Sequence, residues 1–241
     1  MKSLYLILDI AAISGPLFLS FDKKVNFIRQ WKFAFAAILC MMLIFIPWDS
    51  IFTYYGIWGF NEKYTLGPRY AYLPIEEWLF FPATHFAVVF MYECLNTYIK
   101  KDVLARSYKF MLCLFILIGL IVAIFYPSQL YSSLKMGGAA VLTFVVLFFW
   151  NPKWLSRFTL CFLVSLLPFF IMNSILTGSF LDEPIVWYNP HHIFNIRIGT
   201  IPVEDIFYNL FMLLTTFCFY HWFKSWKNDP LIHYPHQNEQ L

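Results

Sequence analysis

Seven apolar runs, each close to the length of a membrane-spanning helix, constrain this chain more than any other feature. They lie near residues 3–20, 33–50, 77–98, 110–126, 134–150, 158–177 and 203–222. A helix needs about 17–25 residues to cross the hydrocarbon core of a bilayer. The chain is 60% hydrophobic and only 13% charged, whereas soluble domains carry about 25% charged residues. We therefore expect an all-α integral membrane protein with about seven transmembrane helices.

Basic residues in the connecting segments support the count of seven. Twelve of the 17 Lys and Arg residues fall in alternate connections and the C-terminal tail, namely Lys23, Lys24, Arg29, Lys32, Lys100, Lys101, Arg106, Lys109, Lys153, Arg157, Lys224 and Lys227. Cytoplasmic loops carry such an excess of basic residues. Seven helices place these segments in the cytoplasm, with the N-terminus outside and the C-terminus inside. The net charge of +3 lies in short loops and does not indicate nucleic-acid binding.

An internal repeat divides the chain into two similar halves. A shift of 128 residues aligns residues 56–77 with residues 184–205 without a gap, and 5 of the 22 positions are identical. We expect a first three-helix unit over 1–100, a linking helix over 101–130, a second unit over 131–225 and a polar tail over 226–241. Because the linker is a single helix, both units have the same orientation.

Each copy of the repeat ends in the motif Pro-x-Glu-acid, preceded by a long connection. The connections span residues 48–76 and 178–203. Loops longer than about 15 residues are usually functional or disordered. These two are rich in Trp, Tyr and Ile, a composition that argues against disorder. We expect both connections to pack back onto the helical bundle.

The acids of the motifs are candidates for catalysis. Pro and acids in a first turn are also typical of an ordinary helix start. A helix start, however, does not require the Asn and Arg residues that recur upstream at fixed distances, Asn61, Arg69, Asn189 and Arg197. The repetition therefore favours a functional role for the four acids, Glu76, Glu77, Glu204 and Asp205.

Two adjacent carboxyls beside an apolar cavity cannot both ionise easily, so one is expected to keep its proton. Such an acid can protonate a carbon–carbon double bond. We expect the Arg residues to keep the partner carboxylates ionised and the Asn residues to orient them. Glu76 and Glu77 point about 100° apart on a helix, so their roles should differ. Thr84 lies two turns beyond Glu77, and Asn209 lies one turn beyond Asp205, within hydrogen-bonding reach.

Other polar residues are weaker candidates. Acids inside membrane spans are functional candidates by default, and Asp9 and Glu93 are such acids. His85 is either a proton shuttle or a packed polar contact. Asp49, Asp182 and Glu183 precede the motifs as loop acids or supporting groups. The pair His191-His192 and the five cysteines lack the spacing of a metal site, so no metal is expected.

The residues around the first motif resemble the integral-membrane lycopene cyclase domain. The resemblance rests on Trp48-Asp49, on Ile57-Trp58-Gly59-Phe60-Asn61 and on Pro74-x-Glu76-Glu77-x-x-Phe80-Phe81. That family occurs as two small three-helix subunits or as one fused chain, and this sequence resembles the fused form over nearly its whole length. In the second copy Tyr208 and Asn209 replace the paired Phe, so we expect unequal sites.

The resemblance implies acid–base cyclisation of acyclic carotenoid end groups, such as lycopene to γ- or β-carotene, without net redox change. The four acids would be catalytic, and Asp49 would support them. Aromatic rings would stabilise the carbocation, those of Trp58, Phe60, Phe80, Phe81, Trp187 and Tyr188. Expected partners are the lipophilic carotenoid, membrane lipid and other enzymes of the carotenoid pathway. The chain has no GxGxxG fingerprint, so no flavin is expected.

Three other functions are alternatives to this one. Parallel three-helix repeats with intramembrane acids also suit a proton-coupled transporter of small molecules, which is the main alternative. A membrane prenyltransferase would need Asp-rich magnesium sites, and neither long connection has a DxxxD or DDxxD cluster. A seven-helix retinal protein would need a Lys in its last helix, and residues 203–222 contain none.

Overall fold

The computed structural model describes residues 2–226 and consists mainly of seven α-helices. They are α1 (Leu4–Leu19), α2 (Trp31–Tyr54), α3 (Ile75–Tyr98), α4 (Tyr108–Phe125), α5 (Leu130–Phe144), α6 (Leu155–Leu176) and α7 (Glu204–Ser225). A 3₁₀ turn η1 (Phe27–Gln30) leads into α2, and a π-helical segment η2 (Val145–Trp150) extends α5. The tail beyond residue 226, with Lys227, lies outside the described residues.

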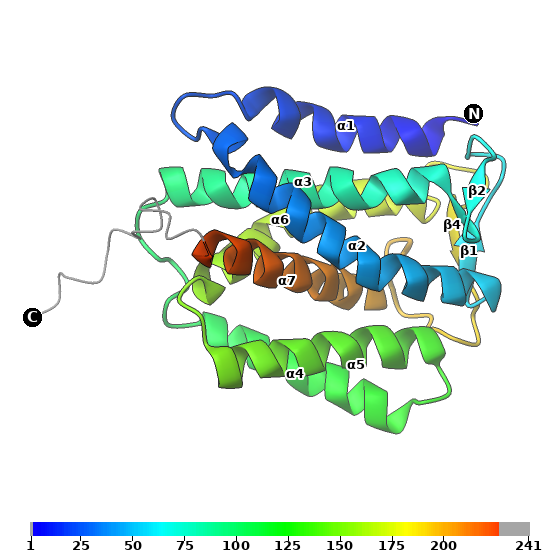
Figure 1. The fold of residues 1–241 in the computed structure, drawn as a ribbon. Helices are drawn as coiled ribbons and strands as arrows, with labels where there is room; N and C mark the ends of the chain where they lie inside the picture. The colour runs from blue at the N-terminus through cyan, green and yellow to red at the C-terminus, as the bar shows by residue number, and fades with distance from the viewer. Residues whose placement is uncertain (1, 227–241) are drawn as a thin grey trace, which may run out of the picture.

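The predicted all-α membrane architecture is confirmed. Six of the described helical segments are long and apolar enough to cross a membrane, and the shorter apolar helix α1 has 16 residues. α3 and α7 both begin at the end of the bundle that carries the strands and run in the same direction (Figure 1). Both acidic motifs therefore lie at the same end of the molecule, as parallel repeats require.

Six short strands cover that end of the bundle. They are β1 (Trp58–Phe60), β2 (Arg69–Tyr70), β3 (Leu73–Pro74), β4 (Val186–Tyr188), β5 (Arg197–Ile198) and β6 (Ile201–Pro202). β2 pairs with β3 and β5 pairs with β6, each within its own half. The two long connections fold back onto the bundle, as the burial of their residues Trp58, Tyr64 and Ile185 shows.

β1 and β4 join the two halves through an antiparallel pair with a pseudo-two-fold axis. Gly59 lies opposite Trp187, its own counterpart in the repeat. A Cβ atom on Gly59 would lie 2.5 Å from the indole of Trp187, so only glycine fits there without a shift. The flanking hydrogen bonds are reciprocal. Asn61 N–H donates to the Ile185 carbonyl at 2.8 Å, and Asn189 N–H donates to the Ile57 carbonyl at 3.0 Å.

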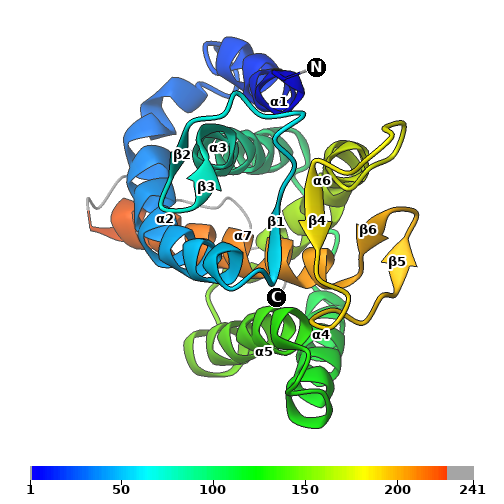
Figure 2. The same ribbon diagram turned by 90° about the vertical axis from the view of Figure 1, so that its right-hand side faces the viewer.

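The packing contacts between helices are equivalent in the two halves. α1 packs on α3 and α5 packs on α7, whereas α2 packs against α7 and α6 packs against α3 (Figure 2). α4 lies against α5, where Gly119 approaches the backbone of Met136 so closely that a Cβ would lie 2.5 Å from its carbonyl oxygen. Small residues allow such close approach between membrane helices.

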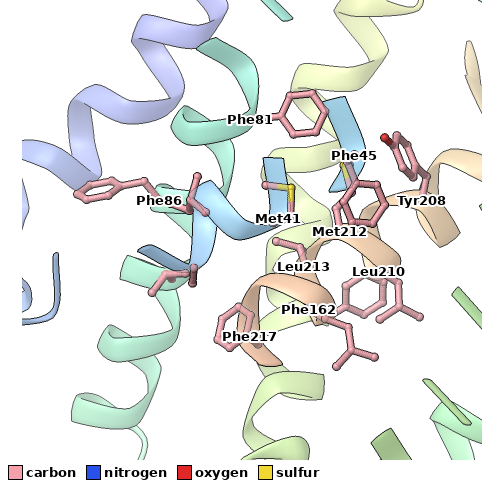
Figure 3. Packing of buried hydrophobic residues seen from close by; sticks show 14 of the residues in the cluster. Met41, Phe45, Phe81, Phe86, Phe162, Tyr208, Leu210, Met212, Leu213 and Phe217 are labelled. Carbon is pink, nitrogen blue, oxygen red and sulfur yellow. The ribbon is translucent and has the colours of Figure 1, made fainter. Parts of the chain in front are cut away.

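Aromatic side chains fill the space between the helices. Figure 3 shows Phe45 of α2, Phe81 of α3 and Phe217 of α7 within one continuous cluster. Edge-to-face contacts recur there, as between Phe45 and Phe211, whose ring centroids are 4.9 Å apart. Each such pair adds about 0.5–1.5 kcal/mol beyond area burial. This packing fixes the ends of α3 and α7 that carry the acids.

Candidate active site

A cavity of about 490 Å³ lies among α1, α3, α6 and α7, with α5, β1 and β4 completing its wall. The wall is mostly apolar. Pockets for small molecules are commonly about 300–1,000 Å³, apolar and furnished with a few polar groups. The polar side chains of this wall are those of Tyr5, Glu77, Thr84, His85, Tyr131, Ser165, Asn173, Tyr188, Asp205, Tyr208 and Asn209. Both halves of the chain therefore contribute to one cavity.

The first acid of each motif does not line the cavity but accepts a hydrogen bond from its own loop. Glu76 Oε1 accepts a hydrogen bond from Leu66 N–H at 2.6 Å. Glu204 Oε1 accepts the equivalent bond from Phe194 N–H at 2.7 Å and a second from Ser132 Oγ at 2.5 Å. Both side chains are fully buried. Their contacts indicate a structural role at the start of α3 and α7.

The second acid of each motif lines the cavity, and the two differ in their hydrogen bonds. Glu77 accepts a hydrogen bond from the Tyr5 hydroxyl, its one hydrogen-bond partner among residues 2–226. Asp205 accepts three, from Tyr131 Oη at 2.8 Å, Tyr188 Oη at 2.8 Å and Asn173 Nδ2 at 2.9 Å. Three donors favour the ionised form of a carboxylate. The two cavity acids are therefore chemically unequal.

Two tyrosines occupy equivalent places in the two halves. Tyr5 on α1 reaches Glu77, and Tyr131 on α5 reaches Asp205. These tyrosines are separated by 126 residues, two fewer than the acids that they contact. Burial, and then the charge of Asp205, hold the pKa of the loop residue Tyr188 well above 10. Its hydroxyl therefore stays protonated and donates to Asp205.

A buried ion pair lies beside the cavity, and only one of its two residues was predicted from the sequence. Lys135 Nζ is 2.6 Å from Asp49 Oδ1, and neither side chain is exposed. Tyr208 Oη donates to Asp49 Oδ2 at 2.5 Å, and Lys135 Nζ lies 3.5 Å from the centroid of the Tyr208 ring. Asp49 was predicted as a supporting residue, but Lys135 was not singled out. Its place inside a predicted span was the available signal.

Three of the six predicted aromatic residues line the cavity, namely Trp58, Phe80 and Tyr188. The other three lie behind or outside the wall. Phe60 stacks on the Tyr5 ring at 6.4 Å, and Phe81 stacks on the His85 ring at 6.2 Å. Trp187 covers Gly59 and is 40% exposed. Of these six aromatic residues, the first three are therefore the ones placed to contact a molecule in the cavity.

The predicted Arg and Asn partners of the acids lie elsewhere. Arg69 forms an ion pair with exposed Glu62 at 3.5 Å, and Arg197 donates to the Thr200 carbonyl at 2.6 Å. Asn61 Nδ2 donates to the Glu183 carboxylate at 2.8 Å. Asn189 Nδ2 donates to the Gly56 carbonyl at 3.2 Å. Because burying a guanidinium is unfavourable without a matching anion, these groups stay near the surface and fasten the strands.

The chain matches the family model described as Lycopene cyclase over residues 2–95 and 129–223. This chain belongs to the lycopene cyclase family. The two matched segments contain α1 to most of α3 and α5 to most of α7, and they leave out α4. Neither the curated proteins nor the solved structures include a match. The resemblance found in the sequence is confirmed, and it implies a carotenoid-cyclising enzyme of the membrane with a carotenoid substrate.

The remaining polar candidates of this lycopene cyclase family member differ in whether they line the cavity. His85 lines the cavity, with Nδ1 2.8 Å from the Phe81 carbonyl. Asn209 also lines it, but Asn173 takes the contact with Asp205 that was expected of Asn209. Asp9 is buried, with both carboxyl oxygens unpaired among the described residues. Within residues 2–226 no group of three His, Cys, Asp or Glu side chains is arranged for a metal.

Glu93 and the loop acids lie away from the cavity. Glu93 binds Lys224 at 3.1 Å, toward the other end of α3. Asp182 pairs with Lys63 at 3.3 Å across exposed loops. Neither contact reaches Glu77 or Asp205.

Proposed function

We propose that this chain is a lycopene β-cyclase in which Glu77 is the acid and Asp205 is the base. The single observation behind this assignment is that these two unequal carboxyls line one apolar cavity. A transporter would need a polar pathway, and the wall described above is mostly apolar. The proposal also uses both halves of the chain, since Glu77 comes from the first and Asp205 from the second.

Glu77 starts the reaction by giving its proton to C2 of the terminal C1=C2 double bond. A tertiary cation is left at C1, and the carboxylate of Glu77 is stabilised by the hydroxyl of Tyr5. A neutral carboxylic acid in an apolar site is a recurrent form of general acid. General acid–base steps of this kind contribute about 10²–10⁴-fold to a rate.

Ring closure follows without a further reactant. The electrons of C5=C6 attack C1, the C1–C6 bond forms, and the cation moves to C5. Rings at Trp58, Phe80 and Tyr188 stabilise the cation through their π faces, by roughly 0.5–2 kcal/mol each. The apolar wall excludes water, which would otherwise add to the cation.

Asp205 completes the reaction by removing the proton from C6. The C5=C6 double bond re-forms, and the product is a β ring with no net oxidation or reduction. The three donors on Asp205 lower its basicity, yet a carbocation is so strong an acid that a weakly basic carboxylate suffices. The same three donors fix the carboxylate in position, which sets the proton that is removed and hence the ring type.

The two halves and the orientation of the chain form part of the same proposal. Residues 1–100 and 131–225 each supply one carboxyl, and the segment 101–130 links them. The basic loops lie in the cytoplasm, so the cavity acids and the strands lie toward the opposite face. Other enzymes of the carotenoid pathway are candidate partners, because they share the membrane-bound substrate.

Expression in cells that accumulate lycopene tests the proposal. Pigment extraction should yield γ-carotene, β-carotene or both. Reaction of the purified protein in D₂O should add one deuterium per ring, because the proton given to C2 comes from an exchangeable acid. Unchanged lycopene, with the protein present in the membrane, would contradict the proposal, and an ε or γ ring would contradict the β assignment.

A further inference from the structure

The cavity is elongated along α3. The wall runs on this helix from Glu77 to Cys94, a separation of 17 residues. At about 1.5 Å per residue this corresponds to about 25 Å, close to the hydrocarbon thickness of a bilayer of about 30 Å. On α1 the wall runs from Tyr5, which contacts Glu77, to Pro16 in the same direction. The acids therefore lie at one end of a long apolar groove.

The groove also reaches the outer surface of the bundle between α1 and α6. Ala11 of α1 and Pro168 of α6 both line the cavity and are both exposed. Among residues 2–226 no hydrogen bond or ring contact joins α1 to α6, which lie on different sides of α3 (Figure 2). In a membrane this flank faces lipid. The cavity is thus open sideways.

The middle of the groove is lined by a buried histidine and by two methionines. His85 is 1% exposed, and its Nδ1 is 2.8 Å from the Phe81 carbonyl. Its Nε2 has no hydrogen-bond partner among the described residues, although His85 lines the cavity. A hydrocarbon polyene cannot form a hydrogen bond with this nitrogen, so the apolar wall and its length, and not His85, point to the ligand. Met91 and Met172, which also line it, adapt readily to the shape of a ligand.

We propose that the carotenoid enters sideways from the lipid through the gap between α1 and α6, past Ala11 and Ala12, and lies along α3. One end group then rests at Glu77 and Asp205 while the rest of the polyene follows the groove. This inference rests on the proposed function for the identity of the ligand. Because only one end group reaches the two acids, only one end is cyclised each time a carotenoid molecule binds. A two-ringed product therefore needs release and re-entry in the reverse direction.

The gap is tested with matched Phe substitutions on α1. Ala11→Phe and Ala12→Phe each place a ring in the gap, whereas Ser14→Phe lies one turn further on the same helix, is also exposed and does not line the cavity. We expect the first two variants to slow lycopene conversion about tenfold or more, because the ring fills the gap. The Ser14→Phe variant should stay within about twofold of the parent chain.

Binding is measured separately from catalysis in a Glu77→Gln background. Lycopene held in a chiral site gains circular dichroism in its visible absorption band, and the rate of that gain reports entry. Addition of Ala11→Phe should slow the gain, and addition of Ser14→Phe should not. Equal rates in both variants, with both folded, would overturn the proposal. If the Glu77→Gln chain takes up lycopene through the gap but the parent chain forms no ring, the proposed function fails and the route of entry stands.

The order of products gives an independent test. With limiting enzyme, one-ringed product should be released before two-ringed product appears. An added excess of unlabelled lycopene should suppress formation of the second ring on labelled molecules. Formation of two-ringed product that resists this competition would contradict a groove that holds one end at a time.

Discussion

The ammonium group of Lys135 lies 2.6 Å from the carboxylate of Asp49, and both side chains are fully buried. Lys135 belongs to α5 and Asp49 to α2, so the pair joins the two halves inside the bundle. Tyr208, which lines the cavity, donates to the same carboxylate and lies against the same ammonium group. The ion pair therefore sets the position of a cavity residue that lies one turn beyond Asp205.

Loss of one partner of this pair should destabilise the protein strongly. Lys135→Met leaves a buried carboxylate without its cation, and such losses cost about 3–5 kcal/mol. The double variant Lys135→Met with Asp49→Asn removes both charges and should recover much of the stability. Thermal unfolding in detergent measures the difference. A single variant as stable as the parent chain would contradict a structural role for the pair.

The two tyrosines that contact the cavity acids should differ in their effect on rate. Tyr5→Phe removes the one donor to Glu77, and a hydrogen bond to a charged group contributes about 1.5–3 kcal/mol. Its turnover of lycopene should therefore fall about 10–100-fold. Tyr131→Phe leaves two of three donors on Asp205 and should have the smaller effect. Tyr126→Phe on the surface serves as the control, and equal losses for Tyr5 and Tyr131 would count against the asymmetry.

The first acid of the motif should tolerate an amide. Glu76→Gln keeps an oxygen that can accept the Leu66 N–H, so turnover should stay within about tenfold of the parent chain. Glu76→Leu removes that acceptor and should lower the free energy of unfolding by about 1–3 kcal/mol. Turnover assays and thermal unfolding of both variants provide the check. Complete loss of activity in a stable Glu76→Gln variant would show that Glu76 takes part in the chemistry.

The pairing of the two halves depends on the absence of a side chain at Gly59. Gly59→Ala would place a Cβ 2.5 Å from the Trp187 ring and should destabilise the protein by about 1–3 kcal/mol. Trp187→Leu in the same chain should restore part of the loss. Gly15→Ala, where nothing lies within 4 Å of the new atom, is the matched control. Thermal unfolding measures these differences. A Gly59→Ala variant as stable as the parent chain would contradict close packing across the axis.

The helices and the position of the acids could be predicted because each depends on local sequence. Apolar runs of sufficient length define the spans, and the gapless repeat places Glu77 and Asp205 at equivalent helix starts. The contacts of the acids could not be predicted in this way. Tyr5 and Tyr131 come from helices that precede the aligned segment, and their spacing of 126 residues differs from the repeat by two. A gapless comparison therefore conceals their equivalence.

The Arg and Asn residues illustrate a different limit. Their recurrence at fixed distances suggested contacts with the acids, yet the chain turns sharply between β2 and β3, where Ala71 and Tyr72 have positive φ angles. The turn leaves Arg69 at the surface beside Glu62. Sequence spacing alone does not give the direction of such a turn. The recurrence instead reflects a loop structure that both halves share.

The most direct test of the account compares Glu77→Gln with Glu62→Gln in lipid, using purified protein and lycopene. Glu77 lines the cavity, whereas Glu62 is an exposed carboxyl of the same connection. The account predicts that Glu77→Gln lowers turnover by about 10²–10⁴-fold, the usual contribution of a general acid, and that Glu62→Gln changes it little. Turnover of the Glu77→Gln variant equal to that of Glu62→Gln would contradict the assignment of Glu77 as the proton donor.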